Sequence, residues 1–265
     1  MDESFLQAEN EFLIGTGLLH VQYGETISGF SGYLDKETGD INSTVIKWTK
    51  LYDVDSNDSH LDSPGFHFFP GAYFSGMLIY ADGSTDYDGY TLSGSPISTT
   101  DLSTFLKGYL SFGKAYKVSE RIILIPKLMA GIQNWKRVSN PNFISNGVNY
   151  ESVEIYRHLN AGFGIKSDVR IWNREIISFG VDFLQNFNSN MTSSYTGNLY
   201  ELGNFETVRV NGEIIMEVTK SVNFYGAIDY ETFNYGKSDI ASDGFLEPDS
   251  KTSLTLYSVG VAYAY

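Results

Sequence analysis

The segment "LTLYSVGVAYAY", residues 254–265, decides the fold. Its residues alternate strictly, so that one face is large and apolar and the other is small. The large face holds Tyr257, Val259, Val261, Tyr263 and Tyr265, and the small face holds Ser258, Gly260, Ala262 and Ala264. Alternation with period two predicts a β-strand. Because chain ends are usually polar and frayed, we expect this strand to have a partner for its backbone edge and an apolar medium for its large face.

The composition favours strands and turns over helices. Aromatic residues make up 15% of the 265 residues, and 26 glycines stand against 6 prolines. No stretch approaches the roughly 18 to 20 uninterrupted apolar residues that a membrane-spanning helix needs. Cysteine is absent, which excludes disulfides and thiolate metal sites. The net charge of −14 repels nucleic acid, so we expect no nucleic-acid partner.

Period-two alternation recurs along the whole chain and predicts about ten strands. They are 12–23, 45–54, 67–81, 100–115, 121–135, 152–166, 175–187, 205–219, 222–233 and 253–265. Many exceed the usual strand length of roughly five or six residues. A length of about 9 to 11 residues is what a tilted strand needs to cross a bilayer.

Short and long connections alternate between these strands. The short connections are 116–120, 167–174 and 220–221, and the long polar ones are 24–44, 82–99, 136–151, 188–204 and 234–252. This alternation is typical of a transmembrane barrel. The connection at 55–66 breaks the rule, so eight or twelve strands also fit. The sequence therefore predicts an all-β fold, an antiparallel up-and-down transmembrane β-barrel of about ten strands, as a single domain over residues 1–265.

A membrane barrel places apolar residues outside and polar residues in its lumen. The polar faces of the predicted strands carry charges that we expect to form an ion-pair network across the lumen. Its predicted members are Lys107, Lys127, Glu154, His158, Asp182, Arg209, Glu213, Glu217, Asp229 and Glu231. Small residues such as Gly162, Gly164 and Gly180 share these faces, and a crowded lumen would require them.

The terminal aromatic residue, preceded by apolar residues at alternate positions, resembles the C-terminal signature of bacterial outer-membrane β-barrel proteins. The resemblance implies that Tyr257, Val259, Val261, Tyr263 and Tyr265 form an assembly signal for the barrel-assembly machinery, and that the last strand pairs with the first. It also implies a location in the outer membrane of a Gram-negative bacterium, after removal of a signal peptide not present in this chain. Membrane lipid and lipopolysaccharide are the expected partners.

Two classes of function fit such a barrel. The first is a narrow pore, or a structural or interaction barrel, with a charged, largely filled lumen and acidic external loops. The alternative is a rim-site barrel enzyme, either an omptin-like protease or a lipid-modifying hydrolase, for which His20 and His158 are the candidate bases. No serine accompanies either histidine at the spacing that a hydrolase would use, so we favour the first class and expect no catalytic residues and no cofactor.

Two further patterns have a chemical interpretation. Asp53, Asp55 and Asn57 match the first three ligand positions of an EF-hand loop, but Pro64 replaces the glutamate at the twelfth, which leaves an improvised Ca²⁺ site or a solvated turn. Acidic loops of this kind could bind divalent cations. The segment "NWKRV", residues 134–138, is typical of a strand end at the membrane interface, with Trp135 at headgroup depth.

Overall fold

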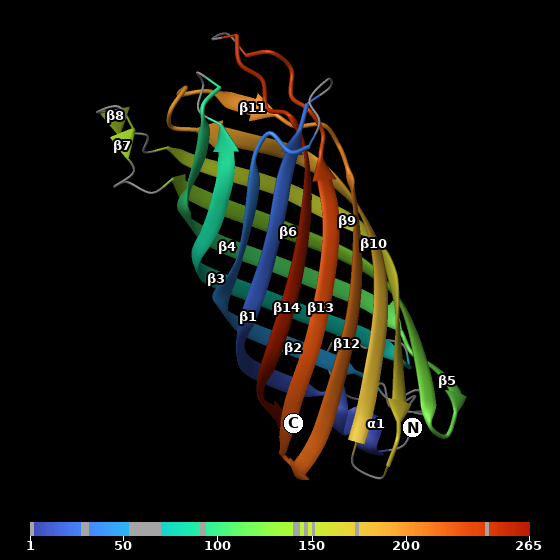
Figure 1. The fold of residues 1–265 in the computed structure, drawn as a ribbon. Helices are drawn as coiled ribbons and strands as arrows, with labels where there is room; N and C mark the ends of the chain where they lie inside the picture. Colours follow the sequence, from blue (N-terminus) through green and yellow to red (C-terminus); the bar gives the residue numbers. More distant parts are fainter. Residues whose placement is uncertain are drawn as a thin grey trace.

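Ten strands close into an antiparallel barrel within the part of the chain that the computed structural model describes, which comprises residues 3–27, 32–52, 70–90, 94–139, 144–145, 148–149, 152–172, 175–241 and 244–265 (Figure 1). Each strand pairs with its neighbours in the chain. The barrel strands are β1 (Glu11–Thr26), β2 (Lys36–Leu51), β3 (Ala72–Tyr90), β4 (Pro96–Lys114), β6 (Ile122–Ser139), β9 (Val153–Arg170), β10 (Glu175–Ser193), β12 (Glu206–Thr219), β13 (Val222–Tyr235) and β14 (Asp249–Ala264). The predicted fold class is confirmed.

The barrel closes where the last strand pairs with the first. The register between β1 and β14 runs without interruption from Glu11 opposite Ala264 to Thr26 opposite Asp249. This pairing satisfies the backbone edge of the strand that ends the chain, because a closed barrel has no free edge.

Four short strands and one helix lie outside the ring. They are α1 (Glu3–Ala8), β5 (Tyr116–Ser119), β7 (Ile144–Ser145), β8 (Val148–Asn149) and β11 (Leu199–Glu201). Both chain termini, α1 and β5 lie at one end of the barrel, which we call the terminal end (Figure 1). The ribbon β7–β8 and strand β11 lie at the opposite end, which we call the loop end (Figure 1). No described helix is long and apolar enough to span a membrane.

The barrel has the inverted polarity of a membrane protein. Outward-facing side chains form an apolar belt around it, and Leu110 on β4 and Phe163 on β9 are 68% and 63% exposed. Inward-facing side chains include buried charges such as Lys107 and Asp182. A soluble barrel would show the reverse, because water would then stabilise the charges outside. The belt therefore indicates contact with lipid.

Several strands are longer than the sequence predicted. β2 begins at Lys36, nine residues before the predicted start at 45, and the predicted loop 82–99 is mostly the hairpin of β3 and β4. The added parts lie toward the loop end, where both faces of a strand carry polar residues and apolar alternation fades. The connection at 55–66, with Asp55 and Asn57, the neighbouring Asp53 and the histidines His60 and His67, lies outside the described residues.

Candidate functional site at the loop end of the lumen

The terminal end of the lumen is filled by the N-terminal helix. Phe5 and Ala8 of α1 are buried against inward-facing residues of several strands, among them Leu51, Ile123 and Ile215. Directly after the helix, Glu9 forms an ion pair with Lys166 on β9, which also lies 3.1 Å from Asp168. The helix and this ion pair close the terminal end.

Buried ion pairs cross the middle of the lumen. On β4, Lys107 Nζ lies 2.8 Å from a carboxylate oxygen of Glu231 on β13. Nearer the terminal end, Asp182 on β10 lies 2.9 Å from Lys127 Nζ and 3.4 Å from Arg209, and Arg209 also pairs with Asp229. We call these the ion layer. A small void of about 60 Å³ lies between Lys127, Arg209 and Asp229 of this layer and Lys47 and Lys166 nearer the terminal end, with room for a few waters.

An aromatic layer lies next, toward the loop end. Trp135 on β6 stacks between Phe105 on β4 and Tyr156 on β9, with ring centroids 5.0 and 5.2 Å apart. The layer reaches the opposite wall because Tyr235 on β13 lies 5.3 Å from Tyr156, and Tyr23 on β1 meets Trp135 edge-on at 5.1 Å. Trp135 is therefore inside the barrel and fully buried, and its predicted place at the membrane interface is wrong.

The structure places the predicted network residues in different surroundings. Six of them meet one another in the ion layer: Lys107, Lys127, Asp182, Arg209, Asp229 and Glu231. Glu213 pairs instead with Lys47 at 2.6 Å, and Glu154 pairs with Arg137 at 3.1 Å. Glu217 is half-buried and has no ion pair with any residue that the structure describes.

Both candidate histidines lie away from an open cleft. His158 is buried in the aromatic layer, where its Nδ1 lies 3.1 Å from the hydroxyl of Tyr235. His20 lies on the outer face of β1, with Nδ1 2.7 Å from Asp40 and Nε2 3.1 Å from the amide nitrogen of Gln22. His20 and Asp40 are arranged like a general base and the carboxylate that orients it, but this pair lies on the outer face of the barrel.

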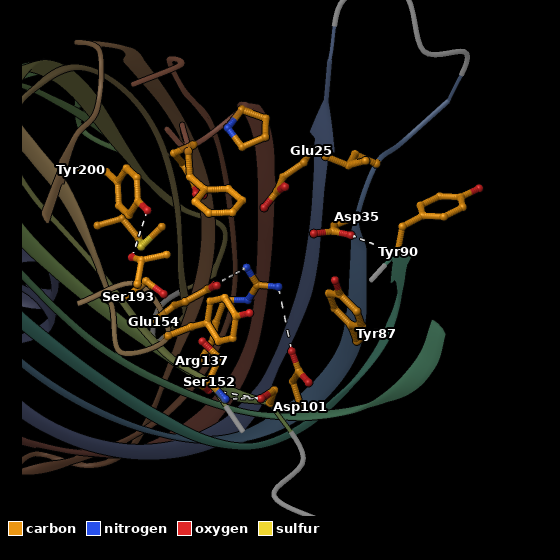
Figure 2. Close-up of a pocket in the computed structure, with 18 of the residues that line it drawn as sticks. Glu25, Asp35, Tyr87, Tyr90, Asp101, Arg137, Ser152, Glu154, Ser193 and Tyr200 are labelled. Atoms are coloured by element: carbon orange, nitrogen blue, oxygen red, sulfur yellow. Dashed lines mark hydrogen bonds and ion pairs between the residues drawn. The ribbon is translucent and has the colours of Figure 1, made fainter. Parts of the chain in front are cut away.

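Above the aromatic layer, a chamber opens at the loop end, with a volume of about 470 Å³ (Figure 2). Arg137 on β6 stands at its floor. Its Nε donates to Glu37 at 2.6 Å and its Nη1 donates to Glu154 at 3.1 Å, while a second Nη lies 4.0 Å from Asp101. Glu37 is buried and also accepts from Ser103 at 2.6 Å. The guanidinium charge is thus already shared between carboxylates of the barrel wall.

Two further carboxyl groups enter the chamber without a cation of their own. Glu25 at the end of β1 accepts from the Tyr23 hydroxyl at 2.6 Å, and Glu247 accepts from the Tyr156 hydroxyl, also at 2.6 Å. The two tyrosine oxygens are 3.3 Å apart. Both carboxyl groups are more than nine-tenths buried, and neither forms an ion pair with a described cation.

Burial raises the pKa of Glu247 to about 8, and the nearby carboxylate of Glu154 adds to the effect. The hydrogen bond from Tyr156 and the charge of Arg137 oppose it. Glu247 belongs to the connection between β13 and β14, outside the barrel strands. At neutral pH its carboxyl group therefore holds a proton.

The chamber was not predicted from the sequence, although one part of its chemistry could have been. Arg137 continues the inward parity of Lys127 on β6, so facing alone could have included it, whereas Glu37 lies in the part of β2 that the sequence predicted as a loop. The sequence does not indicate that Glu25 and Glu247 face the lumen, because they lie where the alternation of the strands ends. No group of three or more metal-binding side chains converges within the described residues.

Comparison with known proteins gives a fold and no closer relative. No family model matches the chain, and no curated protein matches it. Among solved structures, the outer membrane protease OmpT from Escherichia coli is similar over 97% of each chain, with a TM-score of 0.57 at 10% identity. The translocator domain of the autotransporter NalP from Neisseria meningitidis is similar over 100% of this chain and 95% of its own, with a TM-score of 0.44 at 9% identity.

The outer membrane protein OprG from Pseudomonas aeruginosa is similar over 97% of this chain and 96% of its own, with a TM-score of 0.37 at 11% identity. At 10% identity the likeness to OmpT concerns the fold alone. That fold is the outer-membrane β-barrel, as the C-terminal segment indicated.

Proposed function

We propose that this chain, an outer-membrane β-barrel by its fold, is a sealed barrel that serves as a binding protein at its loop end and does not conduct solutes. The observation that supports this proposal best is the order of the layers along the lumen. The helix α1, the ion layer and the aromatic layer lie one after another across the lumen, and the chamber lies beyond all three.

The ion layer supports the sealed state on energetic grounds. Lys107, Lys127 and Asp182 are almost fully buried, and their charges are stabilised by partners on the opposite or neighbouring strands. Separating a buried ion pair leaves an uncompensated charge, which costs about 3–5 kcal/mol. Several such pairs would have to separate together before a solute could pass. The same argument disfavours a narrow pore and favours a structural or interaction barrel.

The alternative, a rim-site enzyme, lacks its base in the chamber. No histidine lines the chamber among the described residues. The histidine–carboxylate pair of His20 and Asp40 lies on the outer wall. We therefore base the proposal on binding.

Planar-bilayer recording of the purified chain tests the sealed barrel. We expect a flat current baseline over many insertions, with insertion confirmed by a fluorescent label on the protein, because the layers remain closed in the folded state. Reproducible unitary current steps that scale with the number of labelled barrels would overturn the proposal.

A further inference from the structure

The charges that line the chamber are out of balance. Five carboxyl groups face it, those of Glu25, Asp35, Asp101, Glu154 and Glu247, against the single guanidinium of Arg137 among the lining residues that the structure describes. All of these except Glu247 are labelled in Figure 2. Because Arg137 forms ion pairs with Glu37 and Glu154, its positive charge is already compensated at the floor of the chamber. The chamber as a whole therefore has an excess of acidic groups over basic ones in a partly enclosed space.

Glu25 and Glu247 are buried side chains with only part of their hydrogen-bonding capacity used. They are 6% and 7% exposed, and each spends one carboxyl oxygen on a tyrosine hydroxyl. For the other oxygen of each, no hydrogen-bond partner is found among the described residues. Burying a carboxylate without a cation is unfavourable, so a chain that places two of them side by side gains most when a positive charge enters from outside.

The remaining walls are aromatic and apolar. They comprise Leu34, Tyr90, Ile97, Met191, Tyr195 and Phe245. A tyrosine ring attracts a cation over its face, and the aliphatic side chains suit an apolar body. The volume of about 470 Å³ lies within the range of roughly 300–1,000 Å³ that is usual for small-molecule sites.

We infer that the chamber binds an organic cation, a primary amine or guanidinium carried on an apolar body, whose positive group lies between Glu25 and Glu247. This inference rests on the proposed binding function and names its ligand class. An ammonium group there would donate to the two free carboxyl oxygens, and charge-assisted hydrogen bonds of this kind are the strong ones.

Binding should also be coupled to release of a proton. Glu247 faces Tyr156 and Glu154 on β9, Glu25 on β1, Arg137 on β6 and Asp35 before β2. Burial and three neighbouring carboxyl groups outweigh the one cation and the hydrogen bond from Tyr156, so the pKa of Glu247 is raised to about 8. An arriving cation stabilises the ionised form and expels the proton, so affinity should rise between pH 6 and pH 8.5.

The test uses the full chain in detergent micelles and isothermal titration with two probes. The first is 2-phenylethylamine, and the second is 2-phenylethanol, which has nearly the same shape and no charge. We expect the amine to bind about 10- to 100-fold more tightly than the alcohol, from charge-assisted hydrogen bonds of about 1.5–3 kcal/mol. We also expect the heat of binding to depend on the buffer, as proton release requires.

The variants assign the effect to the chamber. The double variant Glu25→Gln, Glu247→Gln should lose the preference for the amine. The matched control Asp86→Asn, Glu201→Gln removes two exposed carboxylates elsewhere and should keep it. A heat-dependent shift in gel migration shows that each variant has folded.

Equal affinity for amine and alcohol, no binding of the amine, or an unchanged preference in the double variant would each overturn the inference. Failure of the proposed function is distinguishable from these results. A conducting wild-type barrel would refute sealing while the titration result stood, whereas a silent barrel that does not discriminate between the probes would refute the ligand class.

Discussion

At the scale of single residues, Glu247 connects a loop to the chemistry of the chamber. Its carboxyl group accepts from Tyr156 on the barrel wall, and its backbone N–H donates to Ser238 at 2.8 Å within its own connection. The residue thus ties the segment after β13 down over the mouth. Ionisation of this carboxyl group keeps the hydrogen bond from Tyr156 but places a buried negative charge beside Glu154, which is unfavourable.

We expect the connection between β13 and β14 to loosen as the pH rises. The pKa of Glu247 is raised from 4.5 to about 8 by folding, so the folded state binds this proton more tightly than the unfolded chain does. The stabilisation is complete below about pH 4.5 and is lost as the pH rises through 8. Hydrogen exchange of residues 236–241 and 244–248, corrected for its intrinsic pH dependence, should be up to about 100-fold faster at pH 9 than at pH 6.

The variant Glu247→Gln is the control for this prediction, because an amide keeps an acceptor oxygen and cannot ionise. Its exchange rates should be independent of pH after the same correction. A pH dependence that persists in the variant would assign the effect to another group.

At the scale of elements, the seam between β1 and β14 shows why small residues line the inner face. The sequence attributed them to a crowded lumen, and that reason applies at Gly164, where a Cβ atom would overlap the carboxylate of Asp182. At Gly17 and Gly162 the reason differs. A Cβ atom there would overlap the backbone carbonyl of the neighbouring strand, at Tyr257 and Phe183 respectively. Close approach of two strand backbones therefore requires glycine at these positions.

Gly17→Ala should destabilise the closing seam. The added methyl group must push β1 away from β14, and overpacking of this kind costs about 1–3 kcal/mol. The control is Gly76→Ala on β3, where the nearest side-chain atom, Leu110 Cδ2, would lie 3.5 Å away in ordinary contact. Free energies of unfolding, measured by urea titration in lipid vesicles, should differ between the two variants. Equal values would mean that the seam absorbs the methyl group.

The strands also show which parts of the fold could be predicted from the sequence alone. Every barrel strand was predicted, because apolar alternation is strong wherever a strand faces lipid on one side and the lumen on the other. The upper parts of β2, β3 and β4 were missed because neither of their faces is apolar there. The chamber was missed for a related reason. Glu25 and Glu247 are brought beside Arg137 by closure of the barrel and by a loop, and neither of these two residues leaves a local pattern in the sequence.

At the scale of the whole molecule, the apolar side chains outside the barrel and the charged side chains inside it are arranged for the same membrane environment. The outer belt is suited to lipid, the ion layer compensates charges that are buried away from water, and the chamber lies at the loop end of the lumen. The roles predicted for Tyr257, Val259, Val261, Tyr263 and Tyr265 in assembly remain predictions, as does a partnership with lipopolysaccharide. The outward positions of these five side chains, all between 48% and 63% exposed, fit contact with lipid.

The depth of the belt can be measured on one strand. On the outer face of β4, Leu110 lies within the belt, whereas Leu102 lies beyond Thr104, whose hydroxyl donates to Asp82 at 2.9 Å and thereby marks a polar zone. Leu110→Lys should cost about 2–4 kcal/mol of unfolding free energy in vesicles, and Leu102→Lys about 0–1 kcal/mol. The two variants make the same chemical change on the same face, so their difference reports membrane depth. Equal costs would place both leucines at one depth, and a larger cost at Leu102 would reverse the position of the membrane relative to the chamber.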